Sequence, residues 1–284
     1  MIAICPNPYR DTELELTLKL RSLLEENGFT VGVFPVFSDP VEPAIPEGIE
    51  TRDISYLPRD TTLVIIVGGD GTTLAVARNL KYKDLPLLCV NLGTKGFMAS
   101  LEPEDPELND KIIRAACGEE KLSRRMCIDI DLIRDGKIIY SDSALNDAVI
   151  HGYGDTIRIN AKSDENTVLD YAGDGIVIAT PTGSTGYSMS AGGPIVEPES
   201  ENIILTPICA HALGAKTYVL TQNREVTVKT QKLHTRKAYL AIDGNSIYDL
   251  QSEDIIRVKR SGHCIYLVDF AARSFFEIVA EKLQ

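Results

Sequence analysis

The chain has 284 residues, of which 44% are hydrophobic and 25% are charged, and it carries a formal net charge of −12. This length accommodates one large domain or two of ordinary size, and the composition is that of a globular protein. The negative charge argues against binding to a nucleic-acid backbone or an anionic membrane surface, although local amides or a metal ion can still bind a small anion.

The cysteines and the first residues indicate a reducing compartment. Six cysteines are scattered without a CxxC pair or zinc-type spacing to a histidine, so buried reduced thiols are expected. The segment 1–5 resembles a short strand rather than a signal peptide, and no apolar run reaches the ~18 residues of a membrane span. We therefore expect a cytoplasmic protein that has neither nucleic acid nor membrane as a partner.

The first part of the chain is predicted to be an open α/β layer. A helix is expected over 11–27, ended by Gly28, although alternation over 13–20 also fits a strand. A second helix is expected over 73–80, capped by Thr72. Apolar runs without alternation are typical of buried parallel strands, and they occur at 1–5, 30–34, 63–67 and 85–90.

From Ser123 onward the apolar residues recur with period two, which predicts an antiparallel β domain. Asp135-Gly136 is a hairpin turn signal, and residues 243–246 form another. A helix with an apolar stripe is expected over 271–283. Further short strands are expected at 157–159, 225–229, 238–242 and 255–258. The expected domains are 1–122 plus 269–284, α/β, and 123–268, rich in β-strands.

A glycine-rich loop, GGDGT at 68–72, follows an apolar strand and opens a helix, where exposed amides favour phosphate. It matches neither GxGxxG nor GxxxxGK[ST]. A carboxylate would repel phosphate, so Asp70 is expected to handle a proton or a metal. The alternative is a Gly-Gly turn in which Asp70 caps the next helix.

A second loop, TPTGSTGYSMS at 180–190, follows the apolar run 176–179 and is rich in hydroxyl groups. It is either a ligand-binding segment or a solvated loop. Asn146 and Asp147 interrupt another apolar run, which costs free energy unless their hydrogen bonds are made. They are therefore expected either to bind a ligand or to form a β-bulge or a network that closes the sheet.

Taken together, four motifs resemble the ATP-dependent NAD kinases over essentially the whole chain: GGDGT at 68–72, NLGTKGF at 91–97, LND at 145–147 and DGIVIATPTGSTGYSMSAGGP at 174–194. The resemblance implies a Rossmann-like α/β domain, then an antiparallel β domain, and a C-terminal helix that packs back on the first. It implies transfer of a phosphoryl group from ATP, or from polyphosphate, to the 2′-hydroxyl of the adenosine ribose of NAD, which gives NADP.

Two alternatives stay open. GGDGT alone also resembles the diacylglycerol and sphingosine kinases, so one alternative is a lipid or other small-molecule kinase. The other is a non-catalytic sensor of NAD(P).

The resemblance also assigns roles to residues. Asp70 would be the general base, within a phosphate loop made of Gly68, Gly69, Gly71 and Thr72. The implied substrate-binding residues are Asp70, Gly71, Asn146, Asp147, Asp174, Thr182, Thr185, Gly186, Tyr187, Ser188, Met189, Ser190, Cys209 and Asn245. The two loops are expected to fold into a single crevice. Mg²⁺ or Mn²⁺ would enter with ATP, held largely by phosphate and water without a protein cage of ligands.

Apolar β edges favour self-association, so a homodimer or homotetramer is expected. Two departures concern the acceptor. Asp147 stands where glutamate is common in the family, and Tyr171-Ala172-Gly173 stands where some relatives carry a basic residue. The choice between NAD and NADH is therefore left open.

Overall fold

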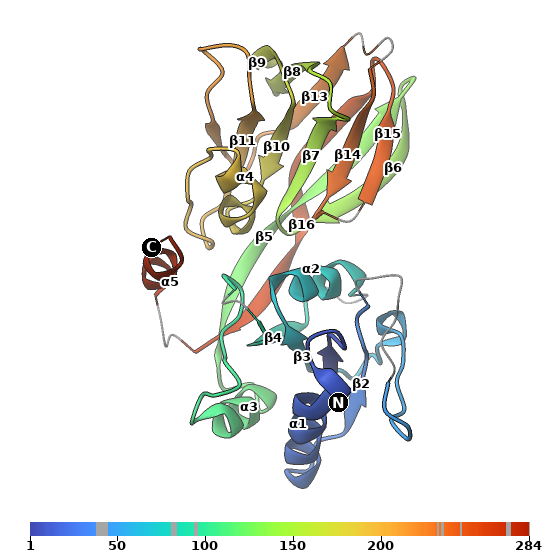
Figure 1. Ribbon diagram of the computed structural model, residues 1–284, viewed down its shortest axis with the longest axis vertical. Coiled ribbons are helices and arrows are strands. Elements are labelled where there is room, and N and C mark those ends of the chain that lie inside the picture. The colour runs from blue at the N-terminus through green and yellow to red at the C-terminus, as the bar shows by residue number, and fades with distance from the viewer. Residues whose placement is uncertain are drawn as a thin grey trace. The chain divides into compact units, whose positions relative to one another are not determined.

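The computed structural model describes residues 1–37, 45–80, 84–93, 96–231, 233, 236–244, 246–270 and 274–283 (Figure 1). The chain divides into two compact units, one made of Met1–Arg124 with Ile265–Gln284 and the other of Arg125–Cys264. Two long strands, β5 (Lys121–Arg134) and β16 (Ile255–Asp269), have residues in both units. None of the described helices is long and apolar enough to cross a membrane.

The first unit is built on a parallel sheet in the order β2-β1-β3-β4, and the end of β16 pairs in parallel with β4. This confirms the predicted α/β class and the four parallel strands, whose bounds differ by one residue at most from those expected. The strands are β1 (Ile2–Pro6), β2 (Val31–Val33), β3 (Leu63–Gly68) and β4 (Pro86–Asn91).

Helices cover both faces of this sheet (Figure 1). Apolar side chains of α1 (Glu15–Glu26) and α3 (Leu108–Ala116) form one core with alternate residues of β1, β3 and β4. On the opposite face, the hydroxyl of Thr73 in α2 (Asp70–Asn79) contacts the Cys89 thiol of β4. Because a parallel sheet is buried on both faces, its strands are apolar throughout, as the sequence indicates.

The first helix confirms the helical alternative for 11–27, but it begins later than expected. A 3₁₀ turn, η1 (Thr12–Leu14), precedes it, with Glu13 and Leu14 in left-handed conformations. The side chain of Asp11 accepts the N–H groups of Leu16 and Thr17, which anchors the first turn. The helix ends before Gly28, whose φ of 84° is the left-handed value that favours glycine at this position.

The predicted start of the second helix is wrong. Helix α2 begins at Asp70, with Gly69 as its N-cap and no side-chain cap bond, rather than at Thr73. Thr72 therefore lies inside the first helical turn and cannot be the N-cap; its hydroxyl accepts a hydrogen bond from Asn7 Nδ2 at 3.0 Å. As a result, Asp70 stands in the first helical turn, where the helix dipole favours a negative charge.

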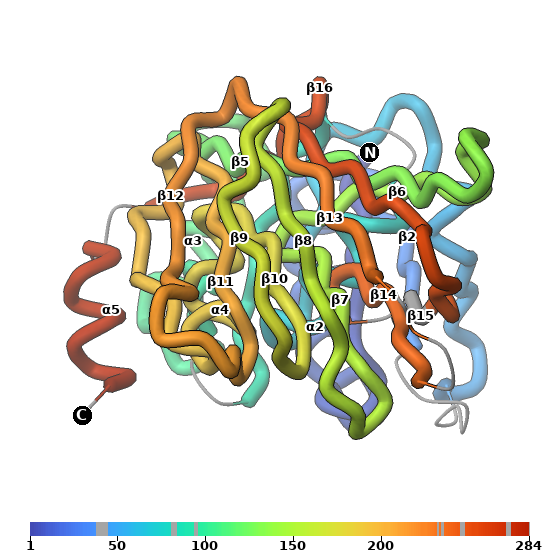
Figure 2. Tube along the Cα trace, turned by 90° about the horizontal axis from the view of Figure 1, so that it is seen from above, coloured from blue at the N-terminus to red at the C-terminus, as the bar shows by residue number. Residues whose placement is uncertain are grey.

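The second unit contains two antiparallel sheets, which confirms the predicted β class. One sheet has the order β12-β11-β10-β7-β14-β15; in the other, β16 is followed by β13, β8 and β9, and β6 pairs with β5 beside β16. Figure 2 shows β9, β8 and β13 side by side. Inward side chains of both sheets share one apolar core. The remaining bounds are β6 (Lys137–Ala144), β7 (Asp147–Gly152), β8 (Ile157–Ser163), β9 (Asn166–Gly173), β10 (Gly175–Ala179), β11 (Asn202–Ile208), β12 (Tyr218–Thr221), β13 (Val226–Gln231), β14 (Ala238–Ile242) and β15 (Ser246–Leu250).

The predicted hairpin turn joins β5 to β6, with φ of 50° at Asp135 and 74° at Gly136. Both residues are left-handed, as the tightest hairpin turns require. The shorter helical segments are η2 (Ile54–Tyr56), η3 (Thr182–Thr185) and α4 (Tyr187–Ser190).

The predicted C-terminal helix is present as α5 (Phe275–Lys282), capped by Ser274 and Glu277 in a reciprocal capping box. Part of the predicted range, 271–273, lies outside the described residues. The expected apolar stripe is not a buried face: none of the residues of α5 is buried, and Leu283 is 54% exposed.

The cysteines correct one expectation. Four of the six are buried, but Cys117 and Cys209 are exposed; all six are free thiols.

Candidate functional site

In the first unit, Asp70 connects two of the motifs. Strand β3 ends at Gly68, and Gly69 leads directly into α2. The Asp70 carboxylate accepts the backbone N–H of Phe97 on Oδ2 at 2.7 Å and that of Met98 on Oδ1 at 3.1 Å. Each oxygen retains a second lone pair, so the carboxylate can still accept a proton or another hydrogen bond.

The approach of the 91–97 motif to Asp70 depends on a glycine. A Cβ atom at Gly96 would lie 2.7 Å from Cγ of Asp70, closer than van der Waals contact allows. The Lys282 ammonium of α5 lies 3.8 Å from the centroid of the Phe97 ring. Burial lowers the pKa of Lys282, while the charge of Asp70 acts in the opposite direction. A cation and a carboxylate therefore influence each other within this unit.

The glycines of the 68–72 loop differ in what they serve. A Cβ atom at Gly68 would lie 2.5 Å from Thr72 Oγ1, so packing alone requires glycine there. At Gly69 and Gly71, by contrast, a Cβ atom would meet no other atom within 4 Å. The fold does not require glycine at these two positions, which leaves room for a ligand to approach the start of the helix.

In the second unit, the 180–190 loop is bonded to the LND motif. Thr180 donates from Oγ1 to the Leu145 carbonyl at 2.5 Å and from its N–H to the Asn146 carbonyl at 2.8 Å. The N–H of Gly183 donates in turn to Thr180 Oγ1 at 3.1 Å. These bonds make the loop part of the folded unit, which excludes the alternative of a solvated loop.

The sequence suggested that Asn146 and Asp147 interrupt a strand. This is wrong, because β7 begins at Asp147. The carboxylate of Asp243 accepts N–H groups from Leu145 at 2.8 Å, Asn146 at 2.8 Å and Asp147 at 3.0 Å. The network alternative is therefore correct for the main chain, but it does not use the side chains of Asn146 and Asp147.

Several polar side-chain atoms here are buried without a partner. Within the described part of the chain, Oδ1 of Asn146 and Oγ1 of Thr182 have no hydrogen-bond partner. Asp147 is only 5% exposed; its burial, and next the charge of Asp243, raise the pKa of its carboxyl group to about 7. Unpartnered buried polar atoms are unfavourable unless ordered water or a ligand satisfies them.

Three further predicted residues gather near this loop. The Cys209 thiol forms a hydrogen bond with Asp174, which raises the pKa of the thiol. Burial raises the pKa of Tyr187, and the charges of Cys209, Asp174 and Asp147 contribute to the same shift. Asp147, Asp174 and Cys209 are therefore all within electrostatic reach of Tyr187, whose side chain is exposed.

Other predicted residues have structural partners or lie elsewhere. Ser188 is buried, and its hydroxyl shares a hydrogen bond with Thr206 of β11 at 2.9 Å. Thr185 donates to the Thr182 carbonyl at 3.2 Å. Asn245 lies outside the described residues. The Asp70 loop belongs to the other unit, and the expectation of a single crevice stays a prediction.

Sequence reasoning missed Asp243 as a site residue, and it assigned no individual role to Thr180, Gly183 and Gly96, which lie within the motifs. The Asp-Gly pair at 243–244 was interpreted only as a turn, and the left-handed φ of 47° at Asp243 agrees with that. Its second role, as the acceptor for three amides almost a hundred residues away, leaves no local signal. In the part of the chain that the structure describes, no group of three or more His, Cys, Asp or Glu residues is placed to hold a metal ion.

Comparison with protein families accounts for both units. Residues 2–114 match the ATP-NAD kinase N-terminal domain, and residues 145–270 match the ATP-NAD kinase C-terminal domain. The NAD kinase of Lachnoclostridium phytofermentans is 36% identical over 98% of this chain and 97% of its own length. That of Natranaerobius thermophilus is 34% identical over 99% and 97%.

Two solved structures share the fold. Yeast NADH kinase, crystallised in complex with NADH, is 25% identical with a TM-score of 0.86, covering 99% of this chain and 86% of its own. An NAD kinase from Archaeoglobus fulgidus in complex with ATP is 24% identical with a TM-score of 0.75, covering 99% of both chains. With both family domains matched and relatives above 30% identity along nearly the whole chain, this protein belongs to the NAD kinase family.

Proposed function

We propose that this protein is an NAD kinase that transfers the terminal phosphoryl group of ATP to the 2′-hydroxyl of the adenosine ribose of NAD, giving NADP. Family membership gives the reaction class. The observation that carries the assignment of the site is that two buried oxygens, Oδ1 of Asn146 and Oγ1 of Thr182, have no hydrogen-bond partner among the described residues, while the carboxyl group of Asp147 is also buried. A ligand that supplies hydrogen-bond donors, as ribose hydroxyls do, would satisfy these oxygens.

In this proposal, Asp70 accepts the proton of the attacking hydroxyl. Phosphoryl transfer requires mainly alignment and charge neutralisation, with one group to accept or orient the proton of the nucleophile. The Asp70 carboxylate accepts hydrogen bonds from two backbone amides. These bonds fix its orientation and leave a free lone pair on each oxygen. Gly69, Gly71 and the start of α2 would receive the phosphates of ATP, while Gly68 and Thr72 shape the loop.

The remaining predicted residues would form the dinucleotide site. Asn146 and Asp147 would bind ribose hydroxyls. The surroundings of the adenosine and nicotinamide ends would come from Asp174, Thr182, Thr185, Gly186, Tyr187, Met189, Ser190, Cys209 and Asn245. Since the Ser188 hydroxyl is buried against Thr206, we assign it to the support of this segment and not to direct contact.

We further propose that Mg²⁺ or Mn²⁺ enters with ATP, bound chiefly to phosphate oxygens and water. The residues present fit such an ion, because the Asp70 carboxylate has free lone pairs that can accept a metal-bound water. The ion would neutralise charge on the donor phosphates. Titration of the assay with a chelator and then with either metal tests this point.

Three further assignments, of the domains, the compartment and the oligomeric state, complete the proposal. We take the two compact units as the catalytic α/β domain and the dinucleotide-binding β domain. Free thiols at all six cysteines are consistent with a reducing cytoplasm. We expect a homodimer or homotetramer, because the edge strand β12 exposes Tyr218 and Val219, and exposed apolar edges favour self-association. Light scattering on the purified protein measures the number of subunits.

The test of the function is an assay of purified protein with NAD, ATP and Mg²⁺, in which NADP is detected by an NADP-specific dehydrogenase. NADP is expected. Tight NAD binding by calorimetry without any turnover would instead indicate a sensor. Replacing NAD by diacylglycerol and analysing the products tests the lipid kinase alternative.

The role of Asp70 is tested with Asp70→Asn, which keeps the shape of the side chain. We expect kcat to fall by about 10² or more while affinity for NAD changes little, as for loss of a general base. Unchanged turnover would show that Asp70 has only a structural role, as the acceptor of hydrogen bonds from the backbone amides of Phe97 and Met98.

A further inference from the structure

We propose that Asp243 is a positioning residue for the dinucleotide site, acting together with Thr180. Its carboxylate holds the main chain of residues 145–147 from one side, and Thr180 holds it from the other. Asn146 and Asp147 can then present their side chains to the ligand. This inference rests on the proposed function, in which these two side chains bind the dinucleotide.

Asp243 and Thr180, which hold the main chain of residues 145–147 by hydrogen bonds, are called the clamp below. Its first half is the carboxylate of Asp243. It is only 7% exposed, and it accepts the three consecutive N–H groups of 145–147 at 2.8–3.0 Å. Its own N–H donates to the Asp147 carbonyl at 3.0 Å. Hydrogen bonds to a charged acceptor are stronger than neutral ones, and three of them compensate the burial of the charge.

The second half comes from the start of the 180–190 loop. The hydroxyl and N–H of Thr180 bind the carbonyl groups of Leu145 and Asn146. Gly183 lies against the Asn146 main chain so closely that a Cβ atom would lie 2.6 Å from its carbonyl carbon. The polar main-chain groups of this short segment are thus bound on both sides, and its path is fixed.

The chemistry of the clamp favours a role in the site over a role in stability alone. The Asp243 carboxylate lies close enough to Asp147 to raise the pKa of that buried acid. Two buried carboxyl groups side by side are unfavourable for folding, and an amide or hydroxyl acceptor would avoid the repulsion. Asn146 and Asp147 are thus held through their main-chain groups. Their side chains remain available to a ligand, as a binding site requires.

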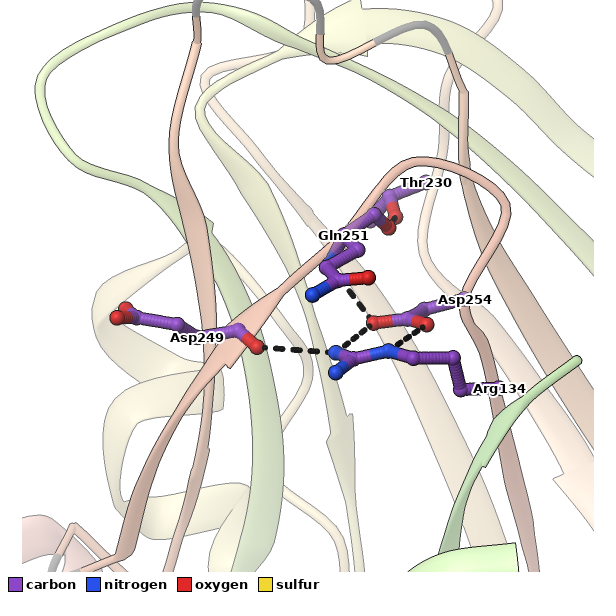
Figure 3. A network of polar contacts seen from close by, with 5 residues as sticks. All are labelled: Arg134, Thr230, Asp249, Gln251 and Asp254. Atoms are coloured by element: carbon purple, nitrogen blue, oxygen red, sulfur yellow. Dashed lines mark hydrogen bonds and ion pairs between the residues drawn. The ribbon is translucent and has the colours of Figure 1, made fainter. Parts of the chain in front are cut away.

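The test compares Asp243→Asn with Asp254→Asn, a matched control in the same unit. Asp254 is 1% exposed and also accepts several hydrogen bonds: from Nε and Nη2 of Arg134 at 2.9 and 2.8 Å, and from the Gln251 N–H at 2.7 Å. As Figure 3 shows, this network also includes the carbonyl of Asp249 and Thr230. None of these residues has a proposed contact with substrate.

Two measurements are made on each variant. The first is hydrogen exchange of the amides of 145–147 in the ligand-free protein. We expect exchange to be at least about tenfold faster in Asp243→Asn, since Asn offers one acceptor oxygen in place of two, and unchanged in Asp254→Asn. The second is KM for NAD, which we expect to rise about tenfold or more in Asp243→Asn only. Thermal unfolding shows how far each substitution lowers stability.

The outcomes separate the inference from the proposed function. Unchanged exchange at 145–147, or the same KM in both variants, overturns the inference. Faster exchange in a protein without any NAD kinase activity overturns the proposed function and, with it, the role that the inference assigns to the clamp.

If Asp243→Asn does not fold, Thr180→Val and Thr180→Ser replace it. We expect valine, which removes the hydroxyl, to raise KM for NAD, and serine, which keeps it, to restore the wild-type value. Equal KM values for the two variants contradict the proposal.

Discussion

Gly183 packs directly against the main chain of Asn146, so that a Cβ atom at position 183 would overlap the Asn146 peptide group, 2.6 Å from its carbonyl carbon. Because the obstacle is backbone held by other hydrogen bonds, it cannot move aside cheaply. We therefore expect Gly183→Ala to displace the 145–147 segment and to lower kcat/KM for NAD by about 10² or more, with a loss of roughly 1–3 kcal/mol in stability from overpacking.

Gly214→Ala is the control for this substitution, since Gly214 has open space around its Cβ position and lies outside the proposed site. It should leave both kcat/KM and the unfolding temperature close to wild type. Wild-type kinetics in Gly183→Ala would show that the close packing of Gly183 against the Asn146 main chain is not needed for activity.

Gly71 offers a test of the phosphate loop that is independent of folding. A Cβ atom at this position meets nothing within 4 Å, and the residue lies in the first turn of α2. Alanine there is accepted by the fold and is favoured over glycine in a helix by roughly 0.5–1 kcal/mol. We expect Gly71→Ala to unfold at the same or a higher temperature but to raise KM for ATP at least about tenfold, because the added methyl group obstructs the approach of phosphate.

Gly262→Ala in β16 serves as the comparison, because its Cβ position is equally open and it has no proposed contact with ATP. A Gly71→Ala protein with normal KM for ATP would move the phosphate site away from this loop.

The sequence predicted the fold class and the strands of the first unit because buried parallel strands are apolar along their whole length. It also placed the Asp135-Gly136 turn, where both residues need left-handed φ. The start of α2 was missed because its N-cap is Gly69, which has no capping side chain, whereas Thr72 looks like a good capping residue in the sequence. The hydroxyl of Thr72 bonds instead with Asn7, which is distant in the chain, and such a tertiary contact is invisible to local propensity.

The residues of the candidate site could be proposed from the sequence only in part. Motif resemblance and small-residue loops indicated Asp70, Asn146, Asp147 and Thr182, but not what holds them. Gly183 and Asp243 both contact the main chain of Asn146, although they lie 37 and 97 residues away from it in the sequence. These contacts depend on the pairing of β10 and β14 with β7, which no local pattern specifies.

The carboxyl group of Asp147 is expected to make stability depend on pH near neutrality. Its folded-state pKa, raised to about 7 by burial and by the charge of Asp243, exceeds the ordinary value of about 3.9 for an unfolded chain. The folded protein therefore binds a proton that the unfolded chain releases, so this contribution to stability is complete below pH ~4 and is lost as pH rises toward ~7. At its steepest the loss is about 1.4 kcal/mol per pH unit.

Asp147→Asn removes this titration while keeping the shape of the protonated side chain. Urea unfolding of both proteins between pH 5 and pH 8 should show the variant gaining on the wild type as pH rises, with the difference levelling off above about pH 7–8. Asp155→Asn, at an exposed position in the same unit, is the control and should show no such gain. A difference between wild type and Asp147→Asn that stays constant across this range would mean that Asp147 is already ionised at pH 5, and that its burial is offset by contacts stronger than the repulsion from Asp243.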